Sequence, residues 1–235
     1  MDIEKDKTKS NILPQMITVG IPSTGMIPYD SFMSFLNLQG ASKLPKLMVG
    51  IAGSQVHKAR NQIVEKMQGE WLMFIDSDMV FQGDVIDKLI AHNKDIVSAL
   101  AFMKRPPFDP CIFDKLSDGQ YLSKRNFPEN QLIEVDAVGM ACTLIKKKVL
   151  KKLKAPHFEN IKVGKSLLGE DVSFCQKAKE AGFKVYCDTS VLVGHLETMP
   201  IGIGQFRQFA QVRDAQSQTQ IRPATPDEIA KLSKK

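Results

Sequence analysis

The sequence predicts an α/β protein with a mostly parallel sheet flanked by helices, because apolar runs alternate with stretches of helical periodicity from residue 16 to residue 193. The run at residues 71–75 is apolar throughout, as expected of a central strand buried on both faces. With 235 residues, 43% of them hydrophobic, a single domain can bury a core without disulfides or a structural metal.

The first hundred residues are expected to hold three strand–helix units and one further strand. Short apolar runs bounded by turn residues predict strands at residues 16–21, 47–51, 71–75 and 95–100. Helical spacing of apolar side chains, preceded by a residue that commonly starts a helix, predicts helices that begin near Pro28, Ser54 and Asp84.

The second half of the chain is less regular. A proline-rich run loosens the pattern between residues 104 and 128, which indicates an insertion or an antiparallel region. A lysine-rich helix is expected at residues 146–154, with a solvated face as its interpretation and an acceptor-docking patch as the alternative. Another helix is expected from Gly169 to Gly182. Further strands are predicted at residues 132–138, 140–145, 184–187 and 191–193.

Three regions are expected along the chain: a flexible N-terminus at residues 1–14, a folded domain at 15–204 and a C-terminal helical tail at 205–235. Every apolar run is shorter than the roughly 18 residues of a transmembrane helix, and the charged start lacks the apolar core of a secretory signal. We therefore expect no membrane span and a cytoplasmic location, with four reduced cysteines. The net charge of +6 favours an anionic partner, such as nucleotide phosphate, nucleic acid, anionic lipid or acidic polymer.

Several common catalytic motifs are missing from the sequence. It contains no G-x-G-x-x-G, H-E-x-x-H or G-x-S-x-G, and the glycine-flanked segment at residues 20–25 is followed by Met26 where a P-loop needs lysine. The remaining candidates for a catalytic or metal-binding site are aspartate and glutamate side chains.

Two carboxylate pairs and one histidine stand at the ends of predicted elements. Asp76 and Asp78 follow the buried strand, where paired carboxylates can hold a divalent cation that bridges phosphates; an aspartate-rich surface turn is the alternative. Glu170 and Asp171 open a helix, either as favourable helix-end charges or as catalytic groups. His195 ends a strand, either as a surface imidazole or as a ligand.

A D-x-D at a strand end, a later G-E-D at a helix start and a histidine at a strand end resemble, in this order, the glycosyltransferase-A (GT-A) fold, in particular the family-2-type nucleotide-sugar transferases. The resemblance covers about residues 16–197. It implies a Rossmann-like, mostly parallel sheet with a small antiparallel region on the acceptor side. It also implies a metal-dependent transferase (EC 2.4) that moves a sugar from a nucleotide sugar to an acceptor hydroxyl.

The resemblance also implies roles for individual residues. Mn²⁺ or Mg²⁺ would be held by Asp76, Asp78 and His195. Asp171 matches the general base, with Glu170 beside it on the acceptor side, and direct displacement would invert the anomeric configuration; a retaining relative would use these carboxylates differently. The remaining nucleotide-sugar-binding residues, which Asp76 would join, are Pro22, Ser23, Thr24, Arg60, Asn61 and Ser77.

The resemblance says less about the sugar donor and the acceptor than about the residues of the site. Ala52 and Gly53 stand where the family often has an acidic residue that reads the base, so uracil, guanine and thymine remain open, with a UDP-sugar as the expected donor. A glycan, a lipid-linked glycan or a modified DNA base are the candidate acceptors. Two other classes of protein are alternatives: a metal-dependent nuclease or phosphohydrolase that uses the same carboxylates, and an inactive GT-A scaffold that binds nucleotide and metal without turnover.

Overall fold

The computed structural model describes residues 16–163, 166–198, 202–203 and 207. By its internal contacts the chain divides into two units, Met1–Glu197 and Thr198–Lys235, and every helix and strand named below belongs to the first. The predicted flexible N-terminus lies outside the described residues, as does the predicted helical tail except for Arg207. In the part of the chain that is described, no helix is both long and apolar enough to cross a membrane.

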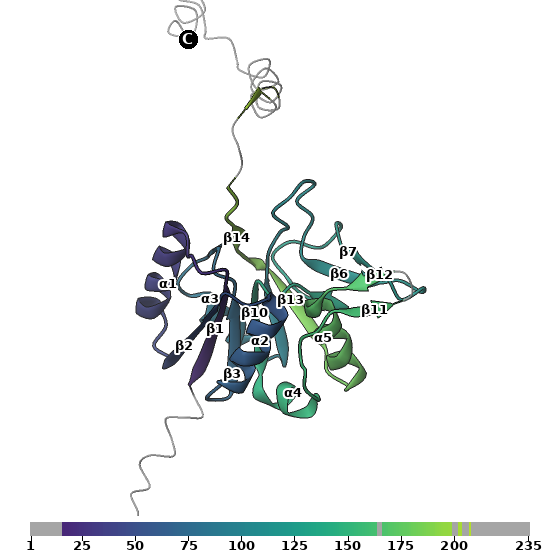
Figure 1. Cartoon of the computed structure of the whole chain (residues 1–235), viewed down its shortest axis with the longest axis horizontal. Helices are drawn as coiled ribbons and strands as arrows, with labels where there is room; N and C mark the ends of the chain where they lie inside the picture. Colours follow the sequence, from purple (N-terminus) through teal and green to yellow (C-terminus); the bar gives the residue numbers. More distant parts are fainter. Residues whose placement is uncertain (1–15, 164–165, 199–201, 204–206, 208–235) are drawn as a thin grey trace, which may run out of the picture. The chain divides into compact units, whose positions relative to one another are not determined.

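A seven-stranded sheet forms the centre of the first unit, with the strand order β2-β1-β3-β10-β5-β13-β8 (Figure 1). Strands β2, β1 and β3 are parallel neighbours, and so are β5 and β13, whereas β10 and β8 run antiparallel to the strands beside them. The predicted α/β class with a mostly parallel sheet is confirmed. The strands are β1 (Ile17–Ser23), β2 (Lys46–Ala52), β3 (Trp71–Ile75), β5 (Ile96–Leu100), β8 (Leu132–Val135), β10 (Cys142–Lys146) and β13 (Val185–Leu192).

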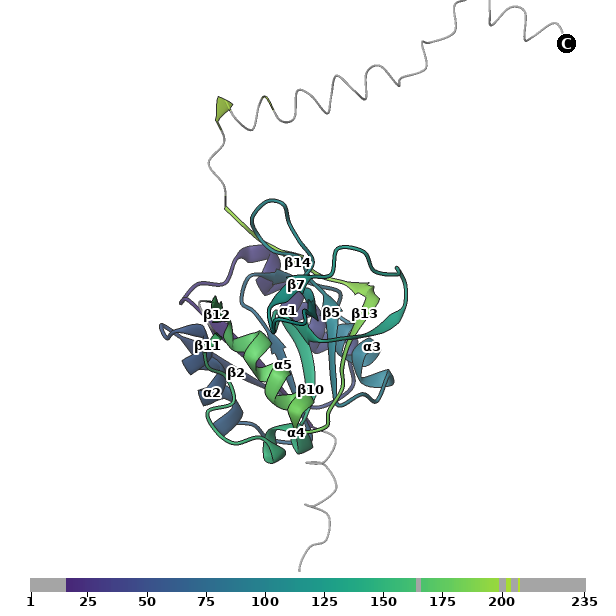
Figure 2. The same ribbon diagram turned by 90° about the vertical axis from the view of Figure 1, so that its right-hand side faces the viewer.

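Helices cover both faces of this sheet, which explains the lack of alternation in β3. Met73 and Ile75 pack in one apolar cluster with α1 and α3, whereas Leu72 and Phe74 pack in a second cluster with α2, α4 and α5. Figure 2 shows α3 and α5 on opposite sides of the sheet. The helices are α1 (Tyr29–Ala41), α2 (Val56–Glu65), α3 (Val85–Ala91), α4 (Lys147–Lys152) and α5 (Glu170–Glu180).

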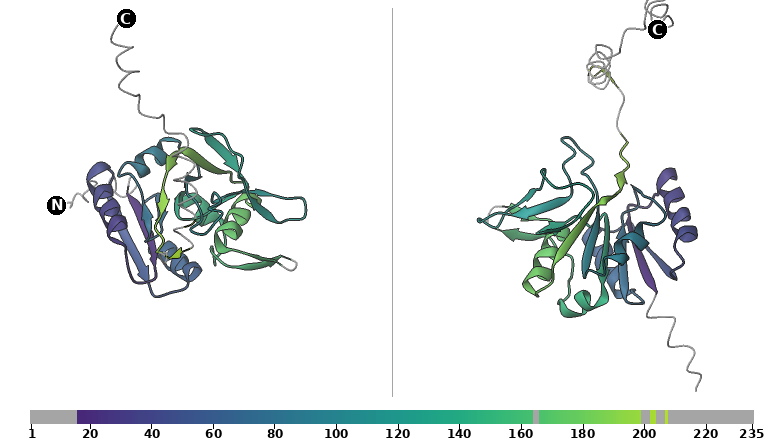
Figure 3. Two further views of the ribbon diagram at one scale, coloured as in Figure 1. Left: turned by 90° about the horizontal axis from the view of Figure 1, so that it is seen from above. Right: turned by 180° about the vertical axis from the view of Figure 1, so that it is seen from behind.

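Three small antiparallel sheets complete the described fold. One is the three-stranded sheet β7-β6-β9, one the hairpin β11-β12 and one the pair β14-β4. Both views of Figure 3 show β6, β7 and the β11–β12 hairpin projecting at one end of the domain, beyond α5. Their bounds are β4 (Met79–Val80), β6 (Ile112–Lys115), β7 (Tyr121–Ser123), β9 (Ala137–Val138), β11 (Ile161–Val163), β12 (Ser166–Leu168) and β14 (Gly194–His195).

The expected antiparallel region at residues 104–128 is confirmed by β6 and β7, but the single strand expected at 132–138 is wrong. The chain leaves the central sheet at Asp136, so β8 pairs with β13 while β9 pairs with β6. Asp136 is fixed at this crossing because its carboxylate accepts a hydrogen bond of 2.7 Å from the Lys115 amide and pairs with Lys179. The residues on both sides of Asp136 are mostly apolar, so the sequence gives no sign that the pairing strand changes from β13 to β6 at this residue.

Candidate active site

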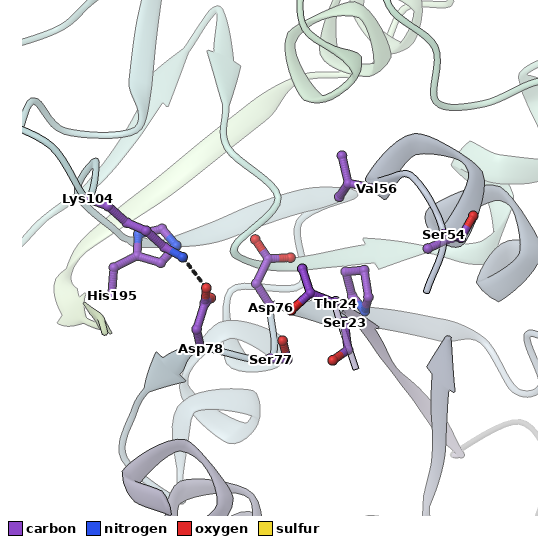
Figure 4. Close-up of a pocket in the computed structure, with 11 residues that line it drawn as sticks. Ser23, Thr24, Ser54, Val56, Asp76, Ser77, Asp78, Lys104 and His195 are labelled. Carbon is purple, nitrogen blue, oxygen red and sulfur yellow. Dashed lines mark hydrogen bonds and ion pairs between the residues drawn. The ribbon is translucent and has the colours of Figure 1, made fainter. Parts of the chain in front are cut away.

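A cavity of about 200 Å³ opens at the carboxyl-terminal ends of β1 and β3 (Figure 4). Parallel strands end at the same edge of a sheet, and this edge is where ligands bind in open α/β folds. Seven of the predicted site residues line the cavity, and they are Pro22, Ser23, Thr24, Asp76, Ser77, Asp78 and His195. The other lining residues are Ser54, Val56, Ala59 and Lys104.

The D-x-D segment is held directly beyond the buried strand β3. The Asp76 amide donates to the Ala141 carbonyl at 3.0 Å, and the Met79 amide donates back to the Asp76 carbonyl at 3.2 Å, which closes a turn over Ser77. Ser77 is buried, whereas the side chains of Asp76 and Asp78 are 23% and 27% exposed. Both carboxylates therefore reach the cavity from a fixed backbone.

The short pair β4–β14 brings His195 to this turn. Met79 lies opposite His195, and the Leu196 amide donates to the Asp78 carbonyl at 2.9 Å. His195 Nδ1 lies 2.6 Å from the Phe102 carbonyl oxygen. Because a carbonyl only accepts, Nδ1 carries the hydrogen and Nε2 is left for another partner. A metal-bound histidine is oriented in the same way, by donating its other ring nitrogen to a carbonyl or carboxylate.

Two carboxylates and one oriented imidazole line the cavity, and these are ligand types that a divalent cation such as Mn²⁺ or Mg²⁺ can accept. The side chains as placed do not converge: within the described residues no group of three histidine, cysteine, aspartate or glutamate side chains could hold a metal ion. A cation is nevertheless present, because the Lys104 ammonium forms an ion pair with Asp78 in the cavity.

Arg60 does not line the cavity but joins the two carboxylate pairs behind it. Its side chain, 4% exposed, pairs with Asp76 at 3.0 Å and also with Glu170. Arg60 Nε has no hydrogen-bond partner in the described part of the chain. One buried guanidinium thus ties the end of β3 to the start of α5.

Asp171, the predicted base, is held in the first turn of α5. Its Oδ1 accepts a hydrogen bond of 2.7 Å from the Val172 amide. A Cβ at Gly169 would lie 3.0 Å from Asp171 Oδ1, so glycine at this position gives the carboxylate its space; one at Gly139 would lie 3.7 Å from Oδ2, an ordinary contact distance. Burial raises the pKa of Asp171 and the neighbouring Glu170 charge raises it further, while Arg60 opposes both. Asp171 therefore binds a proton more readily than an ordinary aspartate.

Asn61 supports the structure around the site instead of lining the cavity. Its Oδ1 accepts from the backbone amides of His157 and Phe158, and its Nδ2 donates to the Phe158 carbonyl at 2.7 Å. The Phe158 ring stacks on Phe174 of α5 at 4.6 Å and meets Phe74 of β3 edge-on at 5.3 Å. This aromatic cluster fixes the distance between the D-x-D strand and the helix that carries Asp171.

Two side chains of the cavity depart from the sequence interpretation. Ser54 was expected to cap the second helix, but Gln55 stands at the N-cap of α2 and Ser54 lines the cavity. Lys104 was not predicted as a site residue at all. The available signal was its position shortly after the apolar strand β5, at the sheet edge where β1 and β3 also end.

A second cavity, of about 440 Å³, lies between the β6–β7 and β11–β12 hairpins. It is partly apolar, and Leu167 on its wall is 66% exposed. Gly169 and Val172, which flank Glu170 and Asp171 in sequence, belong to its lining. The complete lining is Phe113, Asp118, Gly119, Gln120, Tyr121, Val163, Leu167, Leu168, Gly169 and Val172.

Known structures with a related fold include A197 from STIV, which superposes with a TM-score of 0.55 at 20% sequence identity, covering 78% of this chain and 86% of that one. The crystal structure of GalNAc-T7 with UDP, GalNAc and Mn²⁺ gives a TM-score of 0.49 at 11% identity, covering 85% of this chain and 47% of the other. No curated protein sequence matches significantly. The family model described as glycosyltransferase like family 2 matches residues 45–213, well over half of the chain and including the D-x-D, the E-D pair and His195. The predicted family is thereby confirmed, and the chain belongs to glycosyltransferase-like family 2.

Proposed function

We propose that this protein is a metal-dependent transferase that moves a sugar from a nucleotide sugar, with a UDP-sugar as the expected donor, to an acceptor hydroxyl with inversion. The observation that carries the proposal is the buried Arg60, which pairs with both Asp76 and Glu170. It links Asp76, which would help to hold the metal beside the leaving diphosphate, to Glu170, the neighbour of the proposed base Asp171. The leaving group and the attacking hydroxyl must meet at one anomeric carbon, so a sugar transferase needs these two sides of the site to be held close together. Family membership favours this function over a nuclease.

On the donor side, the loop after β1 and the D-x-D turn supply the contacts. The Ser23 hydroxyl accepts from the Gly25 amide at 3.0 Å, which shapes the loop over the cavity that Thr24 also lines. Asp76, Asp78 and His195 Nε2 are the groups that would hold Mn²⁺ or Mg²⁺. When bound, such an ion supplies positive charge next to the departing diphosphate.

On the acceptor side, Asp171 takes the proton from the attacking hydroxyl. Its raised pKa suits it to this task, because a stronger proton acceptor lowers the barrier to attack as long as it is ionised at the working pH. Glu170 is held beside Asp171 by its ion pair with Arg60. We propose the second cavity as the acceptor entrance, since its lining residues Gly169 and Val172 flank this pair. A glycan, a lipid-linked glycan and a modified DNA base are the acceptor candidates.

The first expected result is that UDP binds tightly only together with a divalent ion. Calorimetry of UDP binding in Mn²⁺ and in excess chelator should show loss of affinity in chelator. Asp78→Asn in Mn²⁺ should weaken UDP binding by roughly tenfold or more, because one charged ligand is removed.

Asp114→Asn is the matched control for this experiment. It removes a carboxylate that is also paired with a lysine, Lys124, but lies outside both cavities. Its UDP affinity should equal that of the wild type. Equal UDP binding with and without chelator, or none in either condition, would refute the metal-dependent donor site.

A further inference from the structure

The ion pair between Lys104 and Asp78 is a feature that the general reaction does not require. Figure 4 shows the Lys104 ammonium directed at the Asp78 carboxylate, beside the His195 ring. The position next to Asp78 is thus taken by a positive charge that belongs to the chain itself.

The two positively charged side chains that pair with the D-x-D aspartates, Arg60 and Lys104, differ in how firmly they are held. Arg60 is buried and pairs with two carboxylates at once, Asp76 through Nη2 and Glu170 through Nη1. The Lys104 side chain is 34% exposed, and among the described residues it forms an ion pair with Asp78 alone. A partly exposed lysine pair of this kind contributes little to stability, and its ammonium can change partner at low cost.

The backbone around Lys104 is held in place by contacts on both sides of it. Phe102 forms a bridge with Pro110, and the Met103 amide donates to the Asp109 carbonyl at 2.8 Å. The Phe102 carbonyl also orients His195. One anchored segment therefore carries Lys104 into the cavity and orients the His195 imidazole, which β14 supplies.

We propose that Lys104 is an exchangeable counter-cation of the donor site, paired with Asp78 when no donor is bound and with the donor's diphosphate when a divalent ion takes Asp78. This inference rests on the proposed function. A divalent ion alone must displace the ammonium and remain next to it, and the two like charges repel. A nucleoside diphosphate supplies the anionic partner that Lys104 has lost. Metal and diphosphate should therefore bind cooperatively, and Lys104 is the source of part of that coupling.

The test measures Mn²⁺ binding itself, with and without UDP, by electron paramagnetic resonance of the free ion or by calorimetry. In the wild type, Mn²⁺ should bind weakly alone and at least fivefold more tightly with saturating UDP. Lys104→Met should bind Mn²⁺ alone about tenfold more tightly than the wild type, and the enhancement by UDP should shrink. Lys104→Arg keeps the charge and should retain weak Mn²⁺ binding and the enhancement.

Lys124→Met is the matched control, because it also removes one lysine from a lysine–aspartate pair but lies outside the cavity. It should bind Mn²⁺ like the wild type. If Lys104→Met binds Mn²⁺ alone no more tightly than the wild type while UDP and Mn²⁺ still bind together, the inference fails and the proposed function stands. If neither the wild type nor any variant binds Mn²⁺ or UDP, the proposed function fails and the inference fails with it.

Discussion

Replacing Asp171 with asparagine should slow sugar transfer by roughly 10²- to 10⁴-fold and leave the affinity for UDP and Mn²⁺ unchanged. Asparagine keeps the oxygen that accepts from the Val172 amide and fits the space beside Gly139 and Gly169, but it cannot take a proton. Donor affinity should survive because Asp171 lies outside the cavity lined by Asp76 and Asp78. Transfer rate and nucleotide affinity are measured side by side.

The same substitution should not destabilise the fold. Burial raises the pKa of Asp171 in the folded protein, so the folded state binds a proton more tightly than the unfolded state does. At neutral pH the ionised carboxylate therefore lowers the free energy of unfolding, and its removal should leave Tm unchanged or higher. In the wild type, transfer should be lost as the pH falls through this raised pKa, above the usual range of an aspartate.

Glu180→Gln is the control, since Glu180 is an exposed carboxylate on the same helix. It should leave transfer and nucleotide binding unaffected. Parallel loss of transfer and of metal affinity in Asp171→Asn would contradict the role of base and favour a metal ligand, as in a nuclease. A rate within threefold of the wild type would also contradict it.

Arg60→Met should cost about 3 to 5 kcal/mol of unfolding free energy, because two partly buried carboxylates lose their shared partner. The side chains concerned are 4% exposed for Arg60, 23% for Asp76 and 14% for Glu170. Methionine fills a similar volume, so the loss reflects uncompensated charge and not a cavity. Urea unfolding gives the free energy, and transfer should fall as well because both carboxylates lose their positions.

The double variant Arg60→Met/Glu170→Gln should recover part of the lost stability, since one of the two unpaired charges is removed. Lys88→Met provides the comparison, because Lys88 and Asp84 form an exposed pair at 3.0 Å whose loss should cost less than about 1 kcal/mol. If Arg60→Met unfolds within about 1 kcal/mol of the wild type, Arg60 does not hold the two carboxylate pairs together.

Much of the architecture can be predicted from local pattern, but strand direction cannot. The continuous apolarity of β3 and the helical spacing in α2 and α5 reflect burial on both sides of a sheet, and this burial is visible in the sequence. The antiparallel insertion of β10 between β3 and β5 is set by pairing between segments far apart in the chain. The β4–β14 pair, which brings His195 to the D-x-D turn, is equally long-range. Residue periodicity carries no information on either.

The chemical groups of the site could be predicted, but not the pairing between them. Asp76, Asp78 and Asp171 were identified by their place at strand and helix ends. Arg60 can be buried because Asp76, after β3, and Glu170, at the start of α5, supply carboxylates that pair with it. Both partners lie far from Arg60 in the sequence, so the residues of α2 give no sign that Arg60 is buried. The same holds for Lys104, whose partner Asp78 belongs to a different strand end.

The most direct test of the account is nuclear magnetic resonance of the protein with Mn²⁺, a UDP-sugar and a set of glycan, lipid-linked glycan and modified-DNA acceptors. The account predicts release of UDP together with a new glycosidic linkage of inverted anomeric configuration, both slowed by roughly 10²- to 10⁴-fold in Asp171→Asn. Cleavage of nucleic acid without any sugar transfer, or tight binding of UDP and Mn²⁺ with no turnover of any nucleotide sugar, would contradict it.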